Sequence, residues 1–397
     1  MSQRAKLLSV GTTLTIMLFI SFFDTFTQIP MISPYAASLG AGALMAGWIV
    51  GIYSLTNSIG NIAAGIVLDK FGRRLPLVIG LVWAGFGVFL YGVAKTPMGL
   101  LGARAFHGLG GSILVPAIFA IAADTSESGQ TGRLMARIGA MIGVAAIVGP
   151  MVSGILRQVW GPHGVFLTVF IVMAVGSLLA LTLPETLSQR QQSTQKSAST
   201  PSLPLTAPGF LMINLAALGT GAGLGVLTYL MPLQLERQGF GAAQSSSVFT
   251  IFAIVAVTFM MTVGRRGYRP TTFAIGFLAI AAAFAILALN PSFAVSAIGM
   301  GAFGTGFGLL YPTLNTQVAA MYGPESRGRA YGIFNFFYTL GIVVAPPVIG
   351  WMMEFAQPAV AYACVSAIAL VGAALLYANR HLVEVSQKRR SASPAAV

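Results

Sequence analysis

The chain has 397 residues, of which 56% are hydrophobic and only 8% are charged. A soluble domain has about 25% charged residues, so this composition excludes a soluble protein and indicates an integral membrane protein. The single cysteine, Cys364, excludes an internal disulfide and a cysteine-based metal site. The net charge of +13 does not indicate nucleic-acid binding, because the basic residues lie between apolar stretches and form no basic domain.

Twelve stretches are long and apolar enough to cross a bilayer as helices, for which about 20 residues suffice. They are residues 11–33, 45–67, 76–95, 98–123, 136–157, 164–183, 207–235, 246–263, 271–290, 292–320, 330–353 and 358–378. The first resembles a signal peptide, but it is too long and no small-residue cleavage site closes it, so we expect it to stay in the protein. The expected fold class is all-α, with twelve transmembrane helices.

One long polar break, residues 184–206, separates the sixth stretch from the seventh. It is rich in Ser, Thr, Gln and Pro and offers little to bury, which is typical of a flexible linker. The sequence therefore predicts an N-terminal six-helix bundle (1–183), a cytoplasmic linker (184–206), a C-terminal six-helix bundle (207–380) and a cytoplasmic tail (381–397).

The basic residues predict the orientation in the membrane. If the N-terminus is cytoplasmic, 18 of the 22 Lys and Arg fall on the cytoplasmic side, which is the bias that the positive-inside rule describes. We therefore expect both termini in the cytoplasm and a location in the inner (plasma) membrane.

The two halves of the chain repeat one design. Arg133, Pro150 and Gly154 recur as Arg329, Pro346 and Gly350, each 196 residues later. Six helices in each copy keep both copies in the same orientation, related by an axis along the membrane normal. Positions at which the copies differ are then better candidates for function than positions at which they agree.

Three ionisable residues inside predicted spans belong to the N-terminal half alone. Asp24 has Gln28 one helical turn later, on the same face, and Arg104 has His107 one turn later. A charge at the centre of a membrane helix costs about 2.5–3.5 kcal/mol on insertion scales, so such residues are expected to be functional. The alternative is structural: Asp24 pairs with a neighbour, and Arg104 holds helices together through backbone carbonyls.

Three stretches resemble motifs of the major facilitator superfamily, and within it of the twelve-span drug/proton antiporters. They are "GIVLDKFGRR" (65–74) after the second span, "LLGARAFHGLGGS" (100–112) around a membrane arginine, and "GVAAIVGPMVSG" (143–154) in the fifth span. The resemblance extends over essentially the whole chain. The third stretch carries Ser153 where the family has glycine.

The resemblance implies two six-helix bundles and a role for each group of residues. Asp24, Gln28, Arg104 and His107 would couple protons or bind substrate. A cytoplasmic gating motif would consist of Gly65, Asp69, Gly72, Arg73, Arg74, Asp124, Glu127 and Arg133. The family's antiporter motif would consist of Gly143, Gly149, Pro150 and Gly154, although close helix packing alone explains this stripe of small residues equally well.

The predicted function is secondary transport: proton-coupled export of small hydrophobic or cationic compounds by alternating access. The alternative is uptake or facilitated transport of a polar metabolite, such as a sugar or an organic acid, because one fold supports many substrates. An enzyme is not expected, since the sequence offers no nucleophile–base pair, metal-ligand cluster or phosphate-binding loop. We expect no cofactor beyond the coupling proton, a small-molecule substrate, the lipid bilayer as environment, no nucleic acid, and a monomer.

Overall fold

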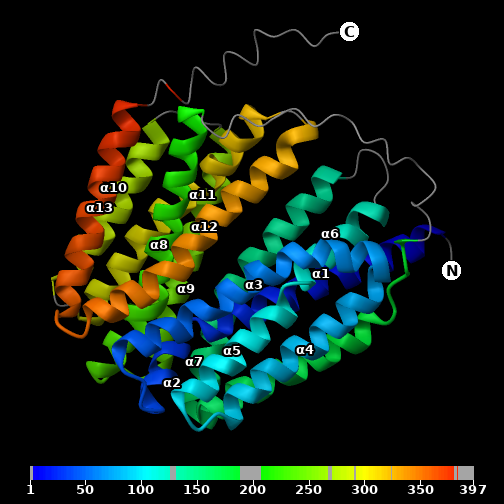
Figure 1. Ribbon diagram of the computed structural model, residues 1–397, viewed down its shortest axis with the longest axis horizontal. Coiled ribbons are helices and arrows are strands. Elements are labelled where there is room, and N and C mark those ends of the chain that lie inside the picture. The colour runs from blue at the N-terminus through cyan, green and yellow to red at the C-terminus, as the bar shows by residue number, and fades with distance from the viewer. Residues whose placement is uncertain are drawn as a thin grey trace. The chain divides into compact units, whose positions relative to one another are not determined.

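The computed structural model describes residues 3–125, 131–187, 207–266, 271–289, 292–322, 324–379 and 382. These residues are almost entirely helical (Figure 1). In hydrocarbon, the N–H and C=O groups of a spanning segment find no water, and a helix satisfies them within the segment itself. The expectation of an all-α fold is confirmed.

Thirteen helices are described. In the first half of the chain they are α1 (Gln3–Gln28), α2 (Ile32–Ser38), α3 (Ala43–Phe71), α4 (Arg74–Val93), α5 (Pro97–Gly111), α6 (Leu114–Thr125) and α7 (Thr131–Ala180). In the second half they are α8 (Pro208–Arg237), α9 (Ala242–Arg266), α10 (Thr271–Leu287), α11 (Phe293–Met321), α12 (Pro324–Met352) and α13 (Pro358–Ala378).

The twelve predicted spans are all represented in these helices. Ten segments of the described part are long and apolar enough to cross a membrane, one of them being α5 and α6 together, and α10 is a shorter apolar helix. One of the ten is the 50-residue α7, which contains the predicted spans 136–157 and 164–183. These two spans meet at Gly161, whose φ of 67° and ψ of −173° are not helical.

The fourth predicted span, 98–123, is divided into α5 and α6 by a turn at Ser112 and Ile113. Pro116 explains the interruption, because its ring has no N–H to donate and crowds the carbonyl four residues earlier. The first predicted span also ends earlier than expected: α1 stops at Gln28, and the short α2 follows a turn.

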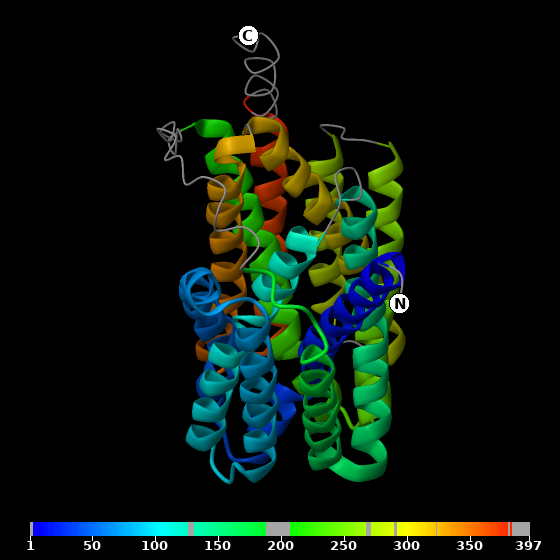
Figure 2. The ribbon, with the colours of Figure 1, turned by 90° about the vertical axis from the view of Figure 1, so that its right-hand side faces the viewer.

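The described residues divide into two compact units. The first lies within Met1–Gln195 and Met231–Thr250, and the second within Lys196–Leu230 and Ile251–Val397. In the first unit α1 packs against α7, as Figure 2 shows, while α5 packs against both α3 and α4. In the second unit α10 packs against α11 and α13.

Two glycines allow α3, α4 and α5 to approach closely in the first unit. A Cβ at Gly87 of α4 would lie 2.7 Å from the Cα of His107 on α5. A Cβ at Gly108 would lie 2.5 Å from the carbonyl oxygen of Tyr53 on α3. Inside a membrane no hydrophobic force drives helices together, and small residues allow them to pack closely. Here Gly87 and Gly108 place His107 between α3 and α4.

Candidate functional site

A buried polar cluster in the first unit contains all four residues predicted to couple protons or bind substrate. Asp24 and Gln28 come from α1, and Arg104 and His107 from α5; each of the four side chains is at least 94% buried. The Gln28 amide donates to Asp24 Oδ1. Asp24 Oδ2 lies 3.0 Å from His107 Nε2.

His107 links the carboxylate to a tyrosine that sequence reasoning missed. The hydroxyl of Tyr91 on α4 lies 2.7 Å from His107 Nδ1, and Arg104 Nη1 donates to the same hydroxyl oxygen over 3.5 Å. The Tyr91 hydroxyl can accept from Arg104 and at the same time donate to His107 Nδ1. In that tautomer the imidazole is neutral and its Nε2–H donates to Asp24. The cluster is a continuous chain from Arg104 through Tyr91 and His107 to Asp24.

Arg104 neutralises this cluster without contacting Asp24 directly. Its Nη1 donates to Gln28 Oε1 over 3.3 Å, and its Nη2 donates to the carbonyl of Val50 over 3.2 Å. The guanidinium also lies 5.3 Å from the centre of the Tyr53 ring, within the range of a cation–π contact. With a neutral His107, the charges of Arg104 and Asp24 balance, and one further proton leaves the cluster with a net positive charge.

The sequence signals for this cluster were uneven. Asp24, Arg104 and His107 stand out because they are ionisable residues in apolar spans. Tyr91 and Tyr53 do not, since a tyrosine in a membrane helix more often packs in the core or at the interface. The structure also shows that Asp24 is paired with Gln28 and His107 and is only 1% exposed.

The gating motif forms a second cluster, where α3, α4 and α6 meet the segment that follows α7. Arg73 donates to Asp69 over 2.8 Å, and its Nε lies 3.5 Å from Asp124. The Asp124 side chain is 7% exposed, whereas that of Asp69 is 74% exposed. Asp124 also accepts a hydrogen bond of 2.8 Å from the hydroxyl of Thr186.

Glu185 holds this cluster together, although the sequence placed it in the linker. Its carboxylate accepts hydrogen bonds from the backbone N–H groups of Arg73, Arg74, Thr186 and Leu187, over 2.8–3.1 Å. The first two lie at the start of α4, where exposed N–H groups favour an anion. At the start of the predicted linker, Glu185 is bound to the start of α4 and Thr186 donates to Asp124. The linker itself stays a prediction, because its residues 188–206 lie outside the described residues.

Gly72 is required at the turn between α3 and α4 for two reasons. Its φ of 90° lies in the left-handed region that favours glycine. A Cβ there would also lie 2.5 Å from the Glu185 carboxylate. The glycine of the motif thus leaves room for the anion that caps α4.

We predict that Glu185→Gln lowers the free energy of unfolding by about 1–2 kcal/mol at neutral pH, because a carboxylate with several N–H donors becomes an amide. Burial raises the pKa of Glu185, but the four backbone donors outweigh burial and leave this pKa below its ordinary value of 4.5. A lowered pKa means that the stabilisation is present above pH 4.5 and is lost as the pH falls through the folded-state value.

Thermal unfolding in detergent at neutral pH and below pH 4.5 tests this prediction. The difference between wild type and Glu185→Gln should shrink in acid. Glu354→Gln is the matched control, since Glu354 is exposed. An equal difference at both pH values would contradict the capping role.

The structure describes the surroundings of only some of the remaining predicted gating residues. Arg74 donates to the carbonyl of Leu183 over 3.3 Å, and a Cβ at Gly65 would meet no atom within 4 Å. Glu127 lies outside the described residues, and the side chain of Arg133 is not among those described. The roles of these residues stay predictions.

The small-residue stripe of α7 packs on α1 at one position and on α9 at another. A Cβ at Gly149 would lie 2.8 Å from Cβ of Phe26, and one at Gly154 would lie 2.9 Å from Cα of Ala243. Gly143 and Pro150 are buried in the same helix. Close packing therefore accounts for Gly149 and Gly154 of the predicted antiporter motif, and any role of the four residues in transport stays a prediction.

An ion pair that sequence reasoning missed lies beyond this stripe. Arg157 of α7 makes two parallel hydrogen bonds to Glu236 near the end of α8, one of them 2.9 Å long. Both side chains are partly buried. The hydroxyl of Thr250 on α9 also donates to the carbonyl of Ile147 on α7 over 3.4 Å. A signal existed, since the predicted topology places Glu236 and Arg157 on the same side of the membrane.

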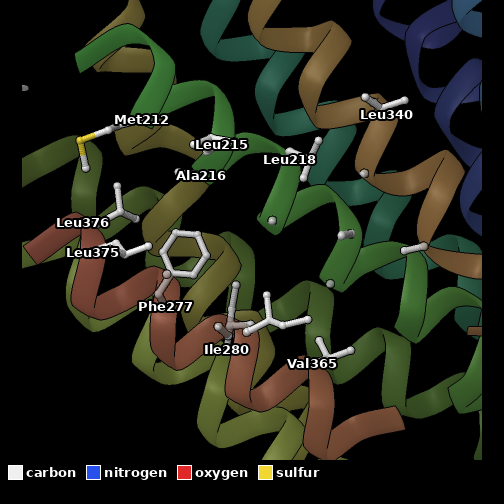
Figure 3. Close-up of a pocket in the computed structure, with 18 of the residues that line it drawn as sticks. Met212, Leu215, Ala216, Leu218, Phe277, Ile280, Leu340, Val365, Leu375 and Leu376 are labelled. Carbon is white, nitrogen blue, oxygen red and sulfur yellow. The ribbon is translucent and has the colours of Figure 1, made fainter. Parts of the chain in front are cut away.

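The second unit contains an apolar cavity of about 720 Å³ between α8, α10, α12 and α13. Figure 3 shows Leu215, Phe277 and Leu375 facing this space from three different helices. Asn379 is the one polar side chain among the described residues that line it, and none of them is charged. This cavity therefore differs chemically from the charged cluster in the first unit.

The sequence model of the Major Facilitator Superfamily matches residues 14–317 and 263–396. Multidrug resistance protein 1 of Bacillus subtilis (strain 168) is 26% identical over 350 residues, which are 86% of this chain and 89% of that protein.

Solved structures share the fold. A bacterial homolog of the human lysosomal transporter Spinster, inward-facing and unoccupied, matches with a TM-score of 0.76 at 16% identity, over 99% of this chain and 100% of that chain. A D-xylose–proton symporter also matches with a TM-score of 0.76, at 15% identity, over 93% of this chain and 97% of that one. At these identities the likeness shows the fold alone.

Proposed function

Because the chain belongs to the Major Facilitator Superfamily and is a multi-pass membrane transporter, we propose that it exports small hydrophobic or cationic compounds in exchange for protons. The single observation that carries the proposal is the buried chain of Asp24, His107 and Tyr91 beside Arg104. Such a chain is expensive to bury in a membrane protein, and intramembrane ionisable groups serve function by default.

Asp24 and His107 are the groups that hold the transported proton in this mechanism. With Asp24 ionised and His107 neutral, the buried charges balance, so the cluster is stable without substrate. An added proton leaves Arg104 uncompensated, and a cationic substrate near Asp24 would do the same. Proton and substrate therefore compete for one negative charge, which couples inward proton flow to export.

The substrate class follows from the distribution of charge. The predicted second bundle contributes few ionisable residues to its spans, and the cavity of the second unit is almost wholly apolar. A sugar or an organic acid would need several polar partners, because buried polar groups must be hydrogen-bonded. A hydrophobic compound with at most one positive charge fits these surroundings better. The similarity to a multidrug resistance protein supports this substrate class.

Alternating access would be controlled at two places in the first unit. The cluster of Asp69, Arg73 and Asp124 is one, as the motif suggests, and Glu185 anchors it. The pair of Arg157 and Glu236 is the other. We further propose that the chain lies in the plasma membrane as a monomer with both termini in the cytoplasm, which places the first cluster on the cytoplasmic side.

The proposal is tested with inverted membrane vesicles under an imposed proton gradient. Lipophilic cationic dyes should be moved into the vesicles by wild type, and collapse of the gradient with an ionophore should stop this movement. A panel of sugars and organic acids is assayed in parallel. Transport of a panel member, with no dye moved, would establish the metabolite transporter in place of the exporter.

A further inference from the structure

The cavity of the second unit has a buried floor and an exposed rim. Val226, Phe277 and Ile280 form part of the floor, and each is at most 4% exposed. The rim is formed by large apolar side chains that are 45–69% exposed: Leu211, Leu215, Val344, Val348, Ile368 and Leu375. The space therefore opens sideways from the helix bundle through apolar residues.

The rim belongs to the surface that meets the bilayer. Helices α8, α12 and α13 are membrane spans by length and composition, and α10 is a shorter apolar helix. Exposed leucines and valines on such helices face hydrocarbon. The cavity thus opens onto a surface of exposed apolar side chains on membrane spans.

The shape of the cavity follows from small residues on two helices. Gly219, Ala222 and Gly223 of α8 and Gly341 and Ala345 of α12 line it, and their short side chains leave the space unfilled. Lining residues on α8 run from Pro208 to Val226, which corresponds to roughly 27 Å of helix at 1.5 Å per residue. The lining therefore follows α8 over much of its length.

The lining chemistry excludes water and favours an unbranched hydrocarbon. A stable buried water needs two to four polar partners, and Asn379 is the one polar side chain among the described lining residues. A site for a specific soluble compound would also carry a few placed polar groups. A flexible apolar chain needs none, and it can lie along α8.

We propose that this groove between α8, α10, α12 and α13 binds one acyl chain of a membrane lipid. The groove lies in the second unit, and the buried charged cluster lies in the first, so this proposal does not depend on the proposed export function. The bound chain fills the bundle wall where glycine and alanine leave it incomplete.

Photolabelling in vesicles tests the proposal. The full-length protein is reconstituted in phosphatidylethanolamine and phosphatidylglycerol that include a phospholipid with a diazirine in one acyl chain, and labelled residues are identified by mass spectrometry. Phe277 and Ile280 on the floor should be labelled as well as Leu278, which is exposed on the same helix and does not line the groove.

Two variants fill the groove from different helices. A Cβ at Gly219 or at Gly372 lies 3.5 or 3.6 Å from the Phe277 ring, an ordinary contact, so either position accepts a side chain. Gly219→Phe and Gly372→Phe should each lower floor labelling by about tenfold while Leu278 keeps its label. Ile275→Trp adds bulk at an exposed position of α10 outside the groove. This variant should change neither the labelling of the floor nor that of Leu278.

Three outcomes would overturn the proposal. An unlabelled floor in wild type with Leu278 labelled would mean that no acyl chain enters. Displacement of floor labelling by a transported dye would make the groove a substrate site. Loss of floor labelling when two copies of the chain are crosslinked across α8 or α13 would make the groove an interface.

Discussion

Asp24→Asn is expected to lower dye export driven by a proton gradient strongly, while the protein still folds. Asparagine keeps the size of aspartate and can accept a hydrogen bond from His107 Nε2, which lies 3.0 Å from the native carboxylate. It removes the negative charge that balances Arg104 and for which proton and substrate would compete. Coupling between two ligands is typically worth about 5–150-fold in affinity, so we expect a loss of gradient-driven export of that order.

Inverted vesicles report the result directly, with dye uptake measured with and without the gradient. Glu354→Gln is the matched control, because it makes the same acid-to-amide change at an exposed side chain outside both clusters. We expect that variant to lose little, since exposed charges contribute less than about 1 kcal/mol. Full gradient-driven export by Asp24→Asn would move the proton site elsewhere, with His107 the next residue to replace.

Glu236→Gln is expected to open the contact between α7 and the start of α9. The first unit includes Met231–Thr250, which contains the end of α8 and the start of α9. Both segments contact α7, through Arg157 with Glu236 and through Thr250 with Ile147. Arg157 holds Glu236 by two parallel hydrogen bonds, and such bidentate pairs are the strong ones. We expect this segment to leave α7 when the transporter opens on that side, so loss of the pair should favour the open state.

Thiol labelling measures this shift. Ser246→Cys places a thiol at a buried position next to Gly154, in a Cys364→Ser background that removes the exposed native thiol. Interaction energies between contacting residues are about 0.5–3 kcal/mol, so Glu236→Gln should speed labelling by roughly tenfold. The exchange of charges, Arg157→Glu with Glu236→Arg, should restore slow labelling; equally fast labelling in the exchanged variant would show that the pair does not act as a latch.

The helices were predictable because their cause is local. A run of apolar residues inside a membrane satisfies its backbone only as a helix, so each stretch can be assigned without knowledge of its neighbours. The twelve spans and the family are confirmed. The break between α5 and α6 was not expected, although Pro116 supplied a local signal for it.

The candidate site was predictable in its members and not in its connections. Asp24, Gln28, Arg104 and His107 are conspicuous in apolar spans, and they do lie together. Tyr91 joins them only because Gly87 and Gly108 let α4 and α3 approach α5 closely. Such contacts depend on how each helix is rotated about its axis and shifted along it relative to its neighbours. The periodicity of the sequence does not determine this rotation or this shift.

The sequence by itself determined that this chain is a helical membrane transporter of known family and which of its residues carry unusual charge. Tertiary structure alone decided that Glu185 caps α4, that Glu236 pairs with Arg157, and that small residues leave a groove along α8. The physical reason is the range of the forces involved. Hydrophobicity and helix formation act within about 20 residues of chain, whereas a hydrogen bond forms only where packing brings two distant groups within about 3 Å.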